Sequence, residues 1–151
     1  MLDFLSKIRY IIRINDNKRK KYIMIQVKKT TDKIGIGIQN MIQGAKDDYI
    51  QMSTSYGRKE LQGYSKEQVD NWDNKTKVSE GKKYIKIVQD TGVFAFVMKE
   101  DSGHLKKGDI LKAAGYNKPA LNSARGNVLN GNYHIQWTGP LYMDSQRRLR
   151  G

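Results

Sequence analysis

The chain has 151 residues, 28 of them basic and 15 acidic, which fits one ordinary domain with a net charge of +13. The absence of cysteine excludes disulfides, thiolate metal sites and cysteine nucleophiles, and it fits a reducing compartment. No run of 18 or more apolar residues is present, so we expect no membrane span.

The excess positive charge lies at the two ends of the chain. Residues 1–29 carry nine basic and two acidic side chains, and residues 144–151 carry three arginines and one aspartate. This asymmetry predicts a polyanionic partner: nucleic acid, an anionic membrane or an acidic protein surface.

The N-terminal elements are predicted from the spacing of apolar residues. Residues 2–14 have a helical stripe, and with the basic residues that follow we expect residues 1–29 to form a basic helical arm. Residues 22–28 are rich in β-formers and predict a strand. Residues 34–38 alternate isoleucine with glycine, which is the period of a strand, although the glycines weaken it. We expect a short helix over residues 41–49.

The middle of the chain is polar. Residues 51–64 predict a loop. Ser65 and Gln68 match a capping box, which predicts a brief helix that reaches Trp72. Residues 73–82 are charged and contain glycine, so we expect a linker there.

The C-terminal half has clearer strand patterns. Residues 84–88 and 93–98 predict a hairpin, and both faces of its second strand are apolar, which favours a central position. A turn that begins at residue 106 leads into a short strand or helix. Pro119 is expected to start a helical turn. Residues 133–137 alternate like a half-buried strand.

These elements together predict an α+β fold. We expect a small, mostly antiparallel sheet in the C-terminal half, short flanking helices and the N-terminal helical arm. A single domain should cover residues 30–151, with its regular β-rich part at residues 83–143.

No residue pattern predicts catalysis, a metal site or a cofactor. The adjacent acids Asp47 and Asp48 are expected to be solvated, because sequence neighbours point apart. His104 and His134 lie 30 residues apart without a carboxylate motif, so we expect both at the surface.

Basic residues next to aromatic ones indicate nucleic-acid binding, through phosphate neutralisation and stacking. This pattern occurs beside Tyr10, Tyr22, Tyr56 and Tyr84, with packing of each ring at the core edge as the alternative. No base-reading motif is present. The predicted nucleic-acid-binding residues are Lys18, Arg19, Lys20, Lys21, Arg125, Arg147, Arg148 and Arg150.

Residues 83–143 resemble a group of small uncharacterised bacteriophage proteins. The resemblance implies a phage-encoded protein that acts in the host cytoplasm or is packaged in a virion. It implies no activity, because that group has none to carry over. The residues that carry it include Lys107-Gly108-Asp109-Ile110-Leu111, Ala124-Arg125-Gly126-Asn127-Val128 and Trp137-Thr138-Gly139-Pro140.

Three functions remain open at this point. The first is a non-enzymatic protein that associates with DNA or RNA through the phosphate backbone, without sequence specificity. The second is a structural component of a virion or other large assembly that contacts neighbouring subunits or itself. The third is an inhibitor or modulator of a host protein, or a peripheral membrane protein.

Overall fold

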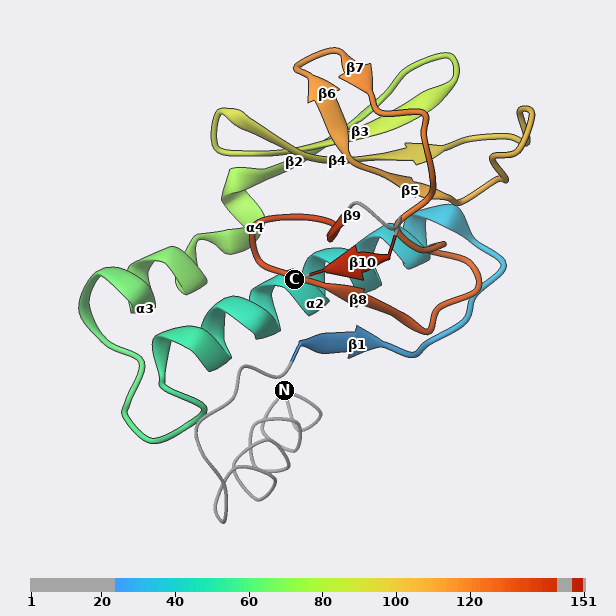
Figure 1. Ribbon diagram of the computed structural model, residues 1–151. Coiled ribbons are helices and arrows are strands. Elements are labelled where there is room, and N and C mark those ends of the chain that lie inside the picture. Colours follow the sequence, from blue (N-terminus) through green and yellow to red (C-terminus); the bar gives the residue numbers. More distant parts are fainter. Residues whose placement is uncertain (1–23, 144–147, 151) are drawn as a thin grey trace.

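The computed structural model describes residues 24–143 and 148–150, and its elements are drawn in Figure 1. The three helices of this part of the chain are α2 (Ile34–Ser53), α3 (Gly63–Asp70) and α4 (Trp72–Lys75). Its strands are β1 (Ile25–Val27), β2 (Thr76–Glu80), β3 (Tyr84–Gln89), β4 (Gly92–Met98), β5 (Ile110–Leu111), β6 (Ala113–Gly115), β7 (Lys118–Pro119), β8 (Tyr133–Ile135), β9 (Tyr142–Met143) and β10 (Leu149–Arg150).

The elements form layers around α2. Strands β2, β3, β4 and β5 make an antiparallel sheet in that order. The β6–β7 hairpin lies over one face of this sheet, and α2 lies against the other face (Figure 1). The antiparallel pair β1–β8 packs on the far side of α2. The predicted α+β class is confirmed, while the predicted helix over residues 2–14 lies outside the described residues.

The β3–β4 hairpin forms as predicted, and β4 is central. Its two-residue turn places Asp90 at a φ of 54°, which aspartate tolerates better than most residues. Opposite the step from Ile87 to Val88 the register shifts, and Phe94 is the extra residue in β4. Phe94 and Ala95 therefore both join the core between the sheet and α2, whereas Phe96 joins the core under β6–β7.

Residues 34–38 begin a 20-residue helix, so the strand prediction for this segment is wrong. Ile34 and Ile38 are four residues apart, which fits a helix as well as a strand, and with Met41 and Ile42 they form one helical stripe. Ile36 points away and is exposed. The longer helical pattern determines the structure because α2 buries that stripe between two β layers.

Two glycines allow α2 to approach its neighbours closely. A Cβ on Gly37 would lie 2.5 Å from the carbonyl oxygen of Val128. A Cβ on Gly44 would lie 2.8 Å from a methyl group of Val27 and 2.9 Å from one of Ile135. These positions lie seven residues apart and therefore on one side of the helix, and at each of them there is no room for a side chain.

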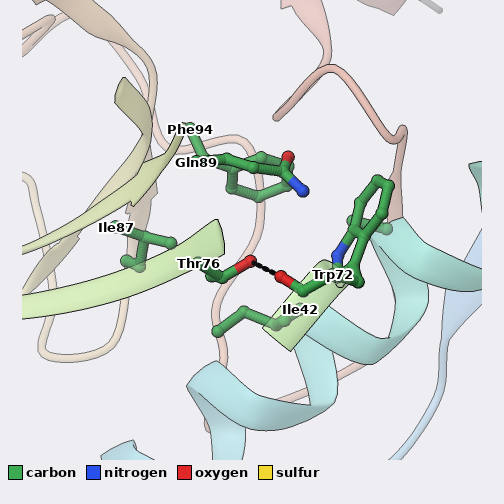
Figure 2. Close-up of a pocket in the computed structure, with 7 residues that line it drawn as sticks. Ile42, Trp72, Thr76, Ile87, Gln89 and Phe94 are labelled. Atoms are coloured by element: carbon green, nitrogen blue, oxygen red, sulfur yellow. Dashed lines mark hydrogen bonds between the residues drawn. The ribbon is translucent and has the colours of Figure 1, made fainter. Parts of the chain in front are cut away.

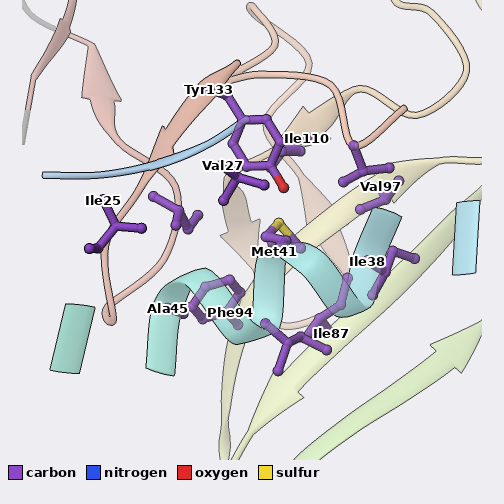
Figure 3. Close-up of a cluster of buried hydrophobic side chains, with 14 of the residues drawn as sticks. Ile25, Val27, Ile38, Met41, Ala45, Ile87, Phe94, Val97, Ile110 and Tyr133 are labelled. Atoms are coloured by element: carbon purple, nitrogen blue, oxygen red, sulfur yellow. The ribbon is translucent and has the colours of Figure 1, made fainter. Parts of the chain in front are cut away.

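Figure 3 shows the core that results from this packing. Met41 and Ala45 of α2 meet Ile87 of the sheet on one side and Val27 of β1 on the other. The second core is smaller and lies under β6–β7, with Phe96, Met98, Leu105 and Leu111 at its centre. The strands predicted at residues 22–28 and 133–137 form as β1 and β8, and this pair packs on α2.

Three further expectations are corrected. The predicted linker at residues 73–82 contains α4 and the edge strand β2, which pairs along its whole length with β3. Pro119 starts no helix: it lies in β7 opposite Ala113. The helix predicted at Ser65 exists as α3, but it begins at Gly63 and no side chain caps it.

Replacing Gly37 with alanine should destabilise the protein by about 1–3 kcal/mol, because the new methyl group meets backbone that cannot turn aside. The control is Gly35→Ala in the same helix, where nothing lies within 4 Å of the new Cβ. That change should stabilise by about 0.5–1 kcal/mol through helix propensity. Urea unfolding of both variants measures the difference, and equal effects would contradict the close packing of α2.

Candidate functional site

The residues predicted to bind nucleic acid fall in very different places. Lys18, Arg19, Lys20, Lys21 and Arg147 lie outside the described residues. Arg148 and Arg150 are exposed, and Arg150 pairs with Tyr142 between β10 and β9.

Arg125 is buried, with 5% of its surface exposed. Its Nη1 donates to the Asn122 side-chain oxygen at 3.1 Å and to the Ser123 carbonyl at 2.7 Å. Its Nε has no partner among the described residues. Burial lowers the pKa of the guanidinium. Arg125 therefore bonds within its own loop, and the contact with a phosphate that the sequence predicts for it stays a prediction.

Lys112 is a second cation that binds the protein itself. Its Nζ donates to the Pro140 carbonyl at 2.6 Å and lies 3.8 Å from the ring centroid of Tyr142. Burial, and secondly the charge of Arg125, lower the pKa of this ammonium group. Lys112 ties the segment after β5 to the segment before β9.

Two of the four tyrosines next to basic residues, Tyr56 and Tyr84, belong to the described part of the chain, and both are packed against other side chains. Tyr56 is buried, and Tyr84 lies edge-on to Phe96 with ring centroids 6.1 Å apart. These two rings are not free to stack on bases, so the alternative of core-edge packing holds for both. The exposed rings lie elsewhere, at Tyr64, Tyr116, Trp137 and Tyr142.

A basic surface forms where the β2–β3 and β6–β7 hairpins meet. Lys77 and Lys86 share one face of the sheet, because Lys77 is opposite Val88 and Lys86 is opposite Ser79. The Lys86 Nζ lies 3.5 Å from the ring centroid of Tyr116 and donates to Asn117 at 2.7 Å, which joins the two hairpins. We term the following set the basic hairpin surface: Lys77, Lys82, Lys83, Lys86, Tyr116 and Lys118.

Carboxylates do not neutralise this surface. Within the described ranges, none of its five lysines forms an ion pair. The one acid of the β2–β3 hairpin, Glu80, is paired with Lys99 at 3.2 Å. Four of the lysines are exposed and Lys86 is half-buried. The sequence pattern beside Tyr84 indicated Lys82 and Lys83, but it did not connect them with Lys77 in the predicted linker or with Lys118, which are distant in sequence.

An aromatic groove of about 380 Å³ lies between the helices and the β3–β4 turn. Tyr49 is at its centre, with ring centroids 5.2 Å from Trp72 and 5.3 Å from Trp137. Figure 2 shows how Trp72, Gln89 and Phe94 meet over α2 beside the groove. The lining residues are Tyr49, Tyr64, Gln68, Trp72, Gln89, Asp90, Gly92, Val93, Phe94, Trp137 and Thr138.

Asp48 positions the groove. It is 1% exposed, and its two carboxylate oxygens accept from the Trp137 backbone N–H at 2.8 Å and from the Gln51 amide at 2.9 Å. Asp47 is buried too, so the expectation that both acids are solvated is wrong. The bond from Asp48 fixes Trp137 beside Tyr49, although the two segments lie 89 residues apart.

The histidines are at the surface, as expected. His104 and His134 are exposed, and a ring nitrogen of His104 lies 3.0 Å from the Asn122 carbonyl. In the described part of the chain no three acidic or histidine side chains come together as metal ligands would. Over the same residues, no helix is long and apolar enough to cross a membrane.

Comparison of the chain with protein-family models, with curated proteins and with solved structures finds no match.

Changing Asp48 to asparagine should destabilise the protein by about 1–3 kcal/mol, because one of the two accepting oxygens becomes an NH2 donor and leaves a buried N–H group without its acceptor. Tryptophan emission should also shift to longer wavelength as Trp137 loses its anchor. Asp73→Asn, at an exposed position, is the matched control and should change neither. An Asp48→Asn variant with unchanged stability and emission would show that Asp48 does not hold the groove.

Proposed function

We propose that the protein associates with nucleic acid through the phosphate backbone, as a binding protein rather than an enzyme, with the basic hairpin surface as its main contact. The observation that supports this is a set of five lysines that form no ion pair with a described carboxylate. One of them, Lys86, lies over the exposed ring of Tyr116. Cations in such a surface can replace the counterions that phosphates hold in solution.

The distribution of the other cations supports the same choice. Arg125 and Lys112 are occupied by protein carbonyls, so their charge serves the fold. The lysines of the hairpin surface make fewer such bonds: only Lys86 among them donates to a described side chain. An unneutralised cluster is more useful for binding an anion than for stability, since its members repel one another.

The basic ends add long-range attraction in this proposal. The N-terminal cluster at residues 18–21 and the C-terminal arginines raise the net charge to +13. Such a field speeds the encounter with a polyanion and weakens as salt screens it. The expected partner is therefore DNA or RNA, bound with a strong dependence on ionic strength.

The test is fluorescence polarisation of labelled single-stranded DNA, duplex DNA and RNA at several salt concentrations. Changing Lys77, Lys82 and Lys83 to glutamine should reduce the slope of log affinity against log salt by about 2 for single strands, because each lost phosphate contact removes about 0.7. The control changes Lys28, Lys29 and Lys33 to glutamine, which removes the same charge from exposed sites in the loop before α2.

Equal slopes for these two triple variants would contradict the hairpin surface as the main contact. A larger loss from glutamine at residues 18–21 would place that contact at the N-terminal cluster instead. No binding at low salt would overturn the proposed function, because the charge is felt most strongly there. The basic ends would then need protein neighbours, as in the assembly alternative.

A further inference from the structure

The aromatic groove lies beside the basic hairpin surface, and two of its rings face solvent. Tyr64 is 72% exposed and Trp137 is 40% exposed. A volume of about 380 Å³ falls within the range of small-ligand sites. We propose that this groove takes one unpaired base of a single-stranded nucleic acid, an inference that rests on the proposed function and specifies its substrate.

The rings of the groove are held in place before any ligand arrives. Tyr49 contacts both tryptophans, at a tilt of 43° to Trp72 and 78° to Trp137. Asp48 fixes the backbone of Trp137 from below. A rigid aromatic surface loses little conformational entropy on binding, so stacking contributes most of its energy to affinity.

One charged residue, Asp90, lines the groove. Its carboxylate repels phosphate, so the backbone of a bound strand stays outside and only a base enters. A carboxylate accepts hydrogen bonds from the amino group of cytosine, as it does in groove recognition of DNA. Thymine offers no amino group, so the groove should prefer cytosine to thymine.

The groove and the basic hairpin surface approach each other at the end of the β3–β4 hairpin. Lys77 of β2 is opposite Val88 of β3, which is opposite Val93 of β4, and Val93 lines the groove. Lys77 lies on the sheet face that β6–β7 covers, whereas the rings of the groove lie on the α2 side. A bound strand would therefore pass around this end of the sheet, with a base in the groove and the flanking phosphates toward Lys77.

Other occupants fit less well. A small cation also binds aromatic rings with a nearby carboxylate, but it would approach against a net charge of +13. A base in a duplex is stacked and paired, and it reaches a pocket only after the cost of flipping. An unpaired base on an anionic strand meets neither obstacle.

Tryptophan fluorescence reports on this groove directly, because both tryptophans of the chain line it. The full-length protein is titrated with oligodeoxycytidine, with oligothymidine, and with an abasic oligomer of the same length. Oligodeoxycytidine should quench the emission and bind more tightly than oligothymidine. The abasic oligomer should bind by its phosphates alone and leave the emission unchanged.

Three variants sharpen the experiment. Tyr64→Ala, at an exposed site that the fold does not need, should weaken oligodeoxycytidine binding on the order of tenfold, while Tyr142→Ala, an exposed ring outside the groove, should not. Glycine adopts the positive φ of residue 90 without strain, so the Asp90→Gly variant should keep the turn. It should abolish the preference for cytosine over thymine.

The outcomes separate this inference from the proposed function. If no oligomer binds, the proposed function fails. If the abasic and base-containing oligomers bind equally and without quenching, the proposed function stands and the groove inference is overturned. Tighter binding of duplex than of single strands would overturn it as well. Quenching by tetramethylammonium or by a disaccharide, without quenching by oligodeoxycytidine, would assign the groove to a different ligand.

Discussion

Helix α2 is packed between two β layers, and its glycine face makes this possible. Gly37 and Gly44 let the helix lie directly on Val128 and on the β1–β8 pair. Ile42 and Ala45, on the side of the helix turned to the sheet, fill the core between α2 and the sheet. Because the helix is confined from both sides, its last turns hold Asp48 and Tyr49 in fixed positions, and the groove is built on those two residues.

The protein uses its positive charges in two ways. Lys112 and Arg125 are partly or fully buried and bind carbonyl groups of adjoining loops, so they contribute to structure. The lysines around the β2–β3 hairpin are left without counter-charges among the described residues. In the proposed function, the exposed lysines contact the phosphates of a strand and the aromatic groove takes a base.

The elements that were predicted correctly are those whose signals lie within a few neighbouring residues of the sequence. The β3–β4 hairpin follows from alternation and a two-residue turn. The helix at residues 34–38 was missed because the isoleucines fit both a strand and a helix, and the β layers that bury the helical stripe are distant in sequence. The groove was missed for the same reason: Trp137 is held by Asp48 across 89 residues. Arg125 looked like an anion ligand because sequence patterns carry no information on burial.

Photocrosslinking tests the central claim most directly, that a strand lies with its phosphates on the basic hairpin surface and a base in the groove. An oligomer that contains 5-iodocytosine is irradiated with the protein, and mass spectrometry of peptides locates the adducts. The expected adducts lie at Trp137 or Tyr64, the exposed rings of the groove. Adducts confined to peptides outside both the groove and the hairpin surface would contradict it.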